Sequence, residues 1–550
     1  MSEDTANEWS LRPWLLAGLL GLAGLLIWLV TGGNDTVPWQ MAVAAFLFFG
    51  AIAAAFTLDE GRWKEPAIFA FAVGLVMAGL TWRAVRYGES LPDEQYGLAA
   101  GVVATALALP LFQAEFHRRR FATPYSEIYG HVWTDAICAA GALAFTGLSW
   151  AVLALMSELF HLLKIDFLRD LMDEGAFGWT FSGLAAGAAL GTLRNQLKVL
   201  ATLQTVVLLV ASLLAVPLAV GLVMFLLATA VSGPQVLWDA TRSATPLLLA
   251  CAGGAFVLTN AIARQGDEAM TGSRVMRVAG WTLAAVILPL AVFAAFSMGM
   301  RLNQYGLAPE RLWGLVAIFV ACVCGVGYWI ALTRGRKAGW AGHVRKATFQ
   351  VGLAVCALAL LLALPILDFG AISARNQVTR LESGRVTPER FDFTALRWDF
   401  GAPGRRALER LSSSGNAQVA ELAQAALTQS ERVYATFDET NKTRADFKLR
   451  VAPNDAEVRE RVLDYLVANP YQCADRCVAL DLGEASGGGR RVAIVQSGGY
   501  EELLLKPEAA LVRAPSAEEP AITMQPDSVV EVSEARVIRI DGKTVGPPID

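Results

Sequence analysis

Eleven long apolar runs follow one another through the first 370 residues of this chain, and they constrain its fold more than any other feature. A helix needs roughly 20 apolar residues to cross about 30 Å of hydrocarbon. It also satisfies its own backbone hydrogen bonds, which lipid cannot do. The sequence therefore predicts an all-α polytopic membrane domain of about 11 transmembrane helices. Their expected limits are 11–31, 38–57, 66–84, 96–115, 135–163, 177–194, 199–231, 244–264, 275–299, 309–333 and 346–369.

Two of these runs need separate comment. The run at 199–231 is unusually long and contains Pro217, so it is either one long tilted helix or a broken pair. The run at 11–31 follows an acidic leader with no basic region. It is therefore expected to stay in the membrane as a span, since a cleaved signal peptide begins with basic residues.

Charge divides the chain into two parts. Residues 1–370 hold 23 Lys or Arg and 23 Asp or Glu, whereas the much shorter segment 371–550 holds 23 and 27. Since 55% of all residues are hydrophobic, a soluble multidomain enzyme is excluded for most of the length. We expect a helical transmembrane domain over 1–370 and a small soluble α+β domain over 371–550.

The soluble domain is expected to begin with helices and to end with strands separated by glycine-rich turns. The expected helices are 373–383, 407–411, 417–430 and 455–467, and the expected strands are 478–482, 492–496, 501–505 and 529–540. No histidine follows His343, so this segment lacks a Ser-His-Asp set. The pattern favours an interaction or structural module over a hydrolase.

The basic residues predict the orientation in the membrane, because Lys and Arg are retained on the cytoplasmic side. With the N-terminus inside, the inner loops carry 16 Lys or Arg and the outer loops carry 7. An odd number of spans then places residues 371–550 on the opposite side. We expect a bacterial inner-membrane protein with a cytoplasmic N-terminus and a periplasmic C-terminal domain.

Only two of the seven cysteines, Cys473 and Cys477, lie in the polar segment. A bent turn brings residues four apart within disulfide range, and the periplasm favours the bond. A metal site with further ligands and a redox pair remain alternatives, although a redox pair usually has two intervening residues. A structural disulfide is the favoured interpretation.

Ionisable residues inside membrane spans are costly and usually functional, but here they gather at the span ends. Six of them are expected on the periplasmic side: Glu158, His161, Arg301, Tyr305, Arg311 and Asp368. If their helix ends converge, Arg301 or Arg311 is expected to pair with Asp368 or Glu158. The alternatives are a purely structural clamp or residues scattered around the rim. The Glu158-x-x-His161 pair has no second copy, so no metal site is expected.

A basic loop lies between the fourth and fifth runs. Arg118, Arg119 and Arg120 are consecutive and flanked by aromatic residues, which suits a segment in the layer of lipid headgroups. Anionic lipid is the expected partner. Nucleic acid is not expected, because the loop is held between two spans.

Glycines and prolines in the spans indicate close packing. The sixth run carries Gly183, Gly187 and Gly191 at four-residue spacing, which lets helix backbones approach closely. Prolines at 110, 217, 289 and 365 lie inside apolar runs and kink helices. Kinked helices serve either as ordinary packing elements or as the walls of a transport site.

Three segments are distinctive: Tyr125-Ser-Glu-Ile-Tyr-Gly-His-Val-Trp133, the segment 159–167 and Arg301-Leu-Asn-Gln-Tyr-Gly-Leu-Ala-Pro-Glu-Arg311. Together they resemble a bacterial membrane family known as domain-of-unknown-function family 4153. Residues 372–384 and 391–393 are also similar to alphaproteobacterial members. The resemblance covers roughly residues 115–415. It implies a polytopic inner-membrane protein, and it assigns no activity, substrate or catalytic residue.

The sequence leaves two functional classes open. The favoured one is a non-enzymatic envelope scaffold or sensor, whose periplasmic domain contacts an envelope protein. The alternative is a transporter or lipid-handling protein that uses kinked helices and the periplasmic polar residues. An intramembrane enzyme is a third class, but no catalytic residue and no cofactor is indicated. Buried charges and a solvent-accessible cavity would favour transport.

Overall fold

The structure is a computed structural model of the 550-residue chain. It describes residues 9–32, 37–88, 91–92, 94–233, 244–335, 339–429, 432, 444, 447–453, 455–468, 473, 476–484, 490–496, 499–505, 512–513, 539–540 and 543–544. The chain divides into two compact units, Met1–Ser430 and Glu431–Asp550. The first unit thus includes residues after 370 that the sequence assigned to a soluble domain.

Within the described residues, ten helices are long and apolar enough to cross a membrane. They are α1 (Arg12–Thr31), α2 (Pro38–Thr57), α3 (Lys64–Tyr87), α4 (Glu94–Gln113), α6 (Tyr125–Leu162), α9 (Leu197–Ser232), α11 (Thr245–Ala263), α12 (Arg274–Tyr305), α13 (Pro309–Gly335) and α14 (Trp340–Ala363). The predicted sixth span is also a helix, α8 (Gly175–Asn195), but it is not among these ten. The chain is a multi-pass membrane protein.

The long run at 199–231 is one helix, which settles the choice that the sequence left open. α9 has 36 residues and continues through Pro217. Proline also lies inside α4 and α12, at Pro110 and Pro289. Pro365 is different, because α14 ends at Ala363. This proline therefore follows a helix and does not kink one.

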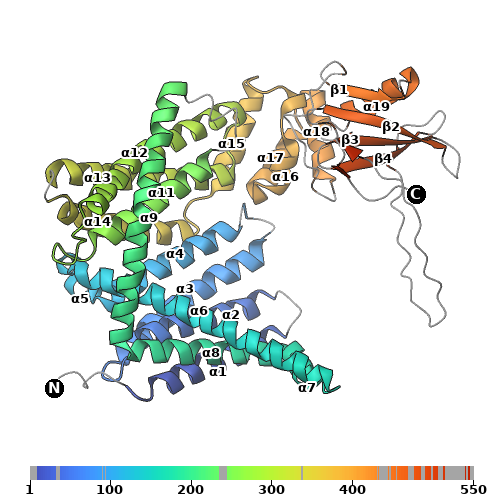
Figure 1. Cartoon of the computed structure of the whole chain (residues 1–550). Helices are drawn as coiled ribbons and strands as arrows, with labels where there is room; N and C mark the ends of the chain where they lie inside the picture. The colour runs from blue at the N-terminus through green and yellow to red at the C-terminus, as the bar shows by residue number, and fades with distance from the viewer. Residues whose placement is uncertain are drawn as a thin grey trace. The chain divides into compact units, whose positions relative to one another are not determined.

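The glycine-containing face of α8 packs directly on α1, as the four-residue spacing predicted. An added Cβ would lie 2.2 Å from the Leu20 carbonyl oxygen at Gly183 and 2.2 Å from the Leu16 carbonyl oxygen at Gly187. At Gly191 it would lie 2.5 Å from the Cα of Pro13. Figure 1 shows the two helices lying together near the N-terminus. Only glycine permits this backbone approach.

Two helix bundles make up the membrane part of the first unit. The first bundle, formed by α1, α2, α3, α4, α6 and α8, has buried residues such as Leu16, Met77 and Leu190. The second bundle, formed by α11 to α14, is centred on residues such as Leu283 and Tyr328. Figure 1 shows α9 running steeply across the direction of α6 and α8.

α9 takes part in the cores of both bundles. Leu200, near its start, packs with Leu16 and Leu190 of the first bundle. Further along, Ala215 and Leu222 pack into the second bundle. One continuous helix therefore packs in both halves of the membrane part, and α14 also contributes Ala363 to the core of the first bundle.

Side-chain contacts show which helix ends share a face of the first unit. On one face, Arg12 at the start of α1 reaches Asp59 after α2 and the Arg194 carbonyl near the end of α8. Tyr125 at the start of α6 reaches Asn260 near the end of α11. We call this the pocket face. The residues in these contacts lie in or next to loops predicted to be on the inner side of the membrane. The contacts therefore agree with the predicted alternation of inner and outer loops along the chain.

The opposite face carries a small helical layer that follows the membrane helices. It consists of α15 (Phe369–Glu382), η3 (Pro388–Arg390), α16 (Phe393–Trp398), α17 (Gly401–Leu411) and α18 (Ala417–Leu427). Its core includes Leu396, Phe400 and Leu408, and Ala308 from the α12–α13 turn joins the same cluster. Shared apolar contacts explain why these residues belong to the first unit.

The second unit is a small α/β fold. Strands β1 (Lys448–Ala452), β2 (Arg476–Glu484), β3 (Arg490–Gln496), β4 (Gly499–Leu505) and β5 (Val512–Arg513) form one sheet in that order. β1 pairs with β2 in parallel, and the other pairs are antiparallel. α19 (Ala456–Ala468) contributes Val458, Val462 and Leu466 to the core.

The predicted strands 478–482, 492–496 and 501–505 are confirmed by β2, β3 and β4. Most of the predicted strand at 529–540 lies outside the described residues; β6 (Arg539–Ile540) is described and pairs with β7 (Lys543–Thr544). The remaining short helices are α5 (Phe116–Arg119), η2 (Arg120–Ala122) and α7 (Phe167–Asp173).

Candidate functional site: a charged pocket at the helix ends

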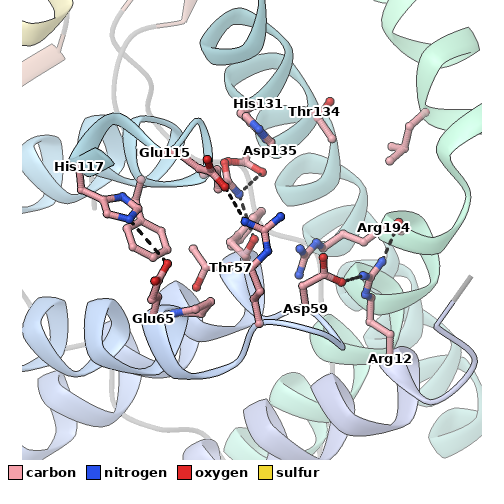
Figure 2. Close-up of a pocket in the computed structure, with 16 residues that line it drawn as sticks. Arg12, Thr57, Asp59, Glu65, Glu115, His117, His131, Thr134, Asp135 and Arg194 are labelled. Carbon is pink, nitrogen blue, oxygen red and sulfur yellow. Dashed lines mark hydrogen bonds and ion pairs between the residues drawn. The ribbon is translucent and has the colours of Figure 1, made fainter. Parts of the chain in front are cut away.

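The pocket face contains a cavity of about 350 Å³ lined mainly by polar side chains. It lies where the ends of six membrane helices of the first bundle meet, and Figure 2 shows its lining. The lining residues are Arg12, Phe56, Thr57, Asp59, Arg62, Glu65, Pro66, Phe112, Gln113, Glu115, His117, His131, Thr134, Asp135, Arg194 and Leu200.

Two arginines connect the helix ends around this cavity. Arg12 is buried and donates to Asp59 Oδ1 at 2.8 Å, to the Arg194 carbonyl oxygen at 3.1 Å and to Asn195 Oδ1 at 3.0 Å. Arg194 donates from Nη1 to the Ala55 carbonyl oxygen at 2.6 Å. Free carbonyls at a helix C-terminus carry partial negative charge, which attracts a guanidinium. These contacts hold α1, α2 and α8 together.

Asp135 is the most unusual residue of the lining. It lies on the third turn of α6, four residues after His131, so both side chains share one face of that helix. Gln113 Nε2 donates to Asp135 Oδ1 at 3.1 Å and to the Phe56 carbonyl oxygen at 2.9 Å. The other carboxylate oxygen, Asp135 Oδ2, is buried and has no hydrogen-bond partner, and the same holds for Gln113 Oε1. Two adjacent acceptors are therefore unsatisfied.

The other carboxylates of the lining are paired. Arg62 donates to Glu115 at 2.5 Å, and Glu65 pairs with Arg118. The hydrogen bond from Arg62, supported by the positive charge of Arg119, holds the pKa of Glu115 below its usual value. Glu115 therefore stays ionised at neutral pH, and both carboxylates are engaged by an arginine.

Once the ion pairs of the pocket lining are counted, one acidic and one basic side chain remain without an ion-pair partner. Asp59 is paired with Arg12, Glu115 with Arg62, and Glu65 with Arg118. Among the described residues, Asp135 and Arg194 are the two charged side chains of the lining that form no ion pair. The two charges attract each other across the lining without a direct contact, so a ligand that lies between them would contact both.

A second polar network lies within the membrane part, between α6 and the second bundle. Asn260 Nδ2 donates to the Tyr328 hydroxyl at 2.7 Å, and Thr348 Oγ1 donates to Asn260 Oδ1 at 3.0 Å. Tyr125 and Tyr129 of α6 also donate to Asn260, through their hydroxyls. Each member contacts another member, so this network serves as a joint between the bundles and has no free site.

The predicted periplasmic cluster does not form as an ion-paired group. Within the described part of the chain, neither Arg301 nor Arg311 pairs with Asp368 or Glu158. Arg311 donates to the Gly306 carbonyl oxygen at 2.7 Å and lies over the Tyr305 ring at 5.5 Å. Asp368 instead accepts from the Ala371 backbone N–H at 2.9 Å and caps α15. Both side chains are satisfied by helix-terminal backbone groups, which compete with the expected ion pair.

Glu158 and His161 lie at the far end of α6, which is 38 residues long. His161 Nδ1 is 2.6 Å from Asp166 Oδ1, just before α7. No group of three or more His, Cys, Asp or Glu side chains suited to a metal ion occurs among the described residues. The contact between His161 and Asp166 stabilises the turn between α6 and α7.

The three consecutive arginines lie on exposed turns of the pocket face. Arg118 pairs with Glu65, and Arg119 pairs with Glu127 at 2.8 Å. Arg120 has a left-handed backbone and no ion pair among the described residues. Arg118 and Arg119 thus have protein partners. Binding of anionic lipid by this loop stays a prediction, and it concerns Arg120 above all.

Cys473 and Cys477 are joined by a disulfide in the second unit, where both are buried in the core between α19 and the sheet. Whether the compartment is oxidising stays a prediction. The five other cysteines, all within predicted spans, are free thiols.

Sequence reasoning missed the pocket, although it used some of its residues. Arg12, Arg62 and Arg194 were three of the 16 basic residues counted in the predicted inner loops, and the sequence pattern indicated no other role for them. The i, i+4 spacing of His131 and Asp135 at the start of the fifth run was a usable signal, because it places two ionisable groups on one helix face. Gln113 carried no signal, since its role depends on a contact with another helix.

Comparison with known proteins gives one match. A family model described as "Domain of unknown function (DUF4153)" matches residues 13–411. No curated protein and no solved structure matches the chain.

Proposed function

The chain belongs to the DUF4153 family, and from that premise and the geometry of its pocket we propose that it transports a small polar solute across a bacterial inner membrane. The matched region contains every pocket-lining residue except Arg12, the first residue of α1. The proposed orientation has the N-terminus and the pocket face in the cytoplasm. The greater number of basic residues in the predicted inner loops supports it.

The observation that carries the proposal is the unpaired carboxylate of Asp135 in a cavity of about 350 Å³. An ionisable residue in a membrane helix is expensive unless it has a role, and such residues commonly mark solute or proton pathways. A cavity of this size suits a small molecule. The two-bundle architecture, joined by α9, supplies elements that can move relative to each other.

The experiment uses the full chain reconstituted in liposomes on a solid-supported membrane, where charge movement is recorded on solute addition. The panel contains a primary amine, a carboxylate, a zwitterionic amino acid and a neutral sugar. We expect at least one to produce a current that Asp135→Asn reduces about tenfold or more, since that change removes the charge and keeps the shape.

The matched control is Asp170→Asn, which removes an exposed carboxylate on α7. It should leave the current unchanged. Absence of both a current and radiolabelled solute uptake for every solute class, with folded protein in the liposomes, would refute transport by this pocket.

An envelope scaffold or sensor is the second candidate. The favouring observation is that a five-stranded sheet with a buried disulfide forms a separate compact unit, which suits contact with a protein partner. Photo-crosslinking from Glu457 on α19 in intact cells tests this candidate. A specific crosslinked envelope protein, together with no transport current, would favour it over the transporter.

A further inference from the structure

We propose that the pocket binds a small zwitterion, a molecule that carries an ammonium and an acid group, such as an amino acid. The inference rests on the proposed function and names its substrate class. It follows from the charged side chains of the lining, which are of both signs. It also follows from the buried hydrogen-bonding atoms without a partner, which include two acceptors and a donor. Figure 2 shows Asp135 and Arg194 at the edge of the same cavity.

The ammonium subsite consists of Asp135 and Gln113. Asp135 Oδ2 and Gln113 Oε1 are buried acceptors without a partner, and the hydrogen bond from Gln113 Nε2 to Asp135 Oδ1 holds the two side chains together. An ammonium has three N–H donors and a positive charge, so it satisfies both acceptors and neutralises the carboxylate. A neutral hydroxyl would donate to only one of the two acceptors and would not neutralise the Asp135 carboxylate.

The acid subsite consists of Arg194 and Arg12. Arg194 forms no ion pair among the described residues, and its Nη1 is held by the Ala55 and Leu58 carbonyl oxygens. Arg12 Nε is a buried donor without a partner. A carboxylate that enters here would gain an ionic contact with Arg194 and a donor from Arg12. Backbone contacts keep both guanidiniums in place before the ligand arrives.

The remaining charges explain why a ligand with only one charge is a poorer fit. Asp59, Glu65 and Glu115 are engaged by Arg12, Arg118 and Arg62. A simple amine would pair with Asp135 and leave Arg194 without a direct ionic partner, and a simple acid would do the reverse. Only a ligand with both charges satisfies the whole lining.

The test measures ligand-dependent thermal stabilisation of the full chain in lipid nanodiscs. The probes are glycine, β-alanine and γ-aminobutyrate, a series of growing charge separation, with ethylamine and acetate as single-charge probes at equal ionic strength. At least one zwitterion should raise the unfolding temperature with saturation. Ethylamine and acetate, alone or mixed, should bind at least about tenfold more weakly.

Two variants separate the subsites. Asp135→Asn should weaken zwitterion binding at least about tenfold. Arg194→Gln should remove the preference for the zwitterion over ethylamine, a change in selectivity that a merely structural role would not produce. Asp170→Asn, the control on α7, should bind like the wild type. Should Arg194→Gln fail to fold, Asp135→Asn and the probe series still decide the matter.

The outcomes distinguish this inference from the proposed function. Binding of a zwitterion with neither a current nor uptake of the radiolabelled zwitterion into the liposomes would sustain the site and refute transport. A current carried by another solute class, with no zwitterion binding, would sustain transport and overturn this inference. Equal binding of ethylamine or acetate and the best zwitterion would also overturn it.

Discussion

At the scale of single residues, buried arginines hold helix ends together. Arg345 at the start of α14 donates to the Ala263 carbonyl oxygen at 2.8 and 3.1 Å, to the Arg264 carbonyl oxygen at 3.0 Å and to Asp267 at 2.7 Å. Its planar guanidinium reaches three partners at once, which a lysine ammonium cannot do in the same geometry. Arg12 plays the equivalent part in the first bundle.

The first prediction at this scale concerns Arg345. Arg345→Leu leaves the last carbonyls of α11 and Asp267 without their donor, so we expect a loss of about 2–4 kcal/mol of stability and a lower unfolding temperature in nanodiscs. Arg345→Lys should recover only part of it. Arg334→Leu, at an exposed arginine of α13, is the control and should change little. Equal unfolding temperatures for Arg345→Leu and wild type would contradict the role.

The second prediction concerns acid sensitivity of the second unit. Arg490 donates to Asp455 at 2.8 Å and to Asp481, and its hydrogen bond holds the pKa of Asp455 below the ordinary value. Burial alone would raise the pKa of Asp481, but hydrogen bonds from Arg490 and the Gly483 N–H bring it below the ordinary value. The stability that a lowered pKa provides is complete above the unfolded value of about 4 and is lost as the pH falls through the folded value.

Hydrogen exchange of the β2 and β3 segments in the full chain provides the measurement. After correction for chemical exchange, protection should be constant from pH 7 to pH 5 and should fall below about pH 4. Arg490→Met should flatten this dependence, and Glu457→Gln should not. An unchanged acid response in Arg490→Met would show that other groups govern it.

At the scale of elements, the glycines of α8 illustrate what sequence can and cannot predict. The four-residue spacing of Gly183, Gly187 and Gly191 predicted a close helix contact, and the structure has one. The identity of the partner, α1, could not be predicted, because spacing defines a face and not its neighbour. The same limit explains Arg311, whose charge was visible while the competing backbone carbonyls of the α12–α13 turn were not.

The third prediction compares two glycines across this contact. Gly187→Val places its Cβ where only 2.2 Å separates it from the Leu16 carbonyl oxygen, so α1 and α8 must move apart. We expect a destabilisation of about 1–3 kcal/mol and rearranged pocket contacts of Arg12. Gly18→Val on α1 meets nothing within 4 Å and is the matched control, read by thermal unfolding. Equal unfolding temperatures in the two variants would contradict the packing.

At the scale of the whole molecule, the succession of membrane helices along the chain and the presence of both helix and strands in the C-terminal unit could be predicted from apolar runs and short alternating segments. The pocket could not. Arg12 and the Arg194 carbonyl are 182 residues apart in the chain, and Gln113 and Asp135 are 22 apart on different helices. Such contacts depend on how helices are ordered in the membrane plane, which hydropathy does not encode.

The fourth prediction concerns topology. Alkaline phosphatase fused after Asp550 should be active, and a fluorescent protein that folds only in the cytoplasm should be dark there, because the charge bias and the eleven spans expected from the sequence place this end outside. The ten candidate spans become eleven if α8 also crosses the membrane, so α8 decides whether the number of spans is even or odd. Bright fluorescence would place the C-terminal unit in the cytoplasm, and free thiols at Cys473 and Cys477 in rapidly alkylated cells would agree with that result.

The length of α9 has a mechanical consequence. Its 36 residues rise about 1.5 Å each, so the rod is roughly 54 Å long. Leu200 near one end packs by the pocket, and Leu222 toward the other end packs in the second bundle. Treated as a lever pivoting near its first turns, a tilt of ~5° displaces its far end by roughly 5 Å. If the pocket binds a solute as proposed, a sub-ångström adjustment beside Leu200 becomes a displacement of several ångströms where α9 packs in the second bundle.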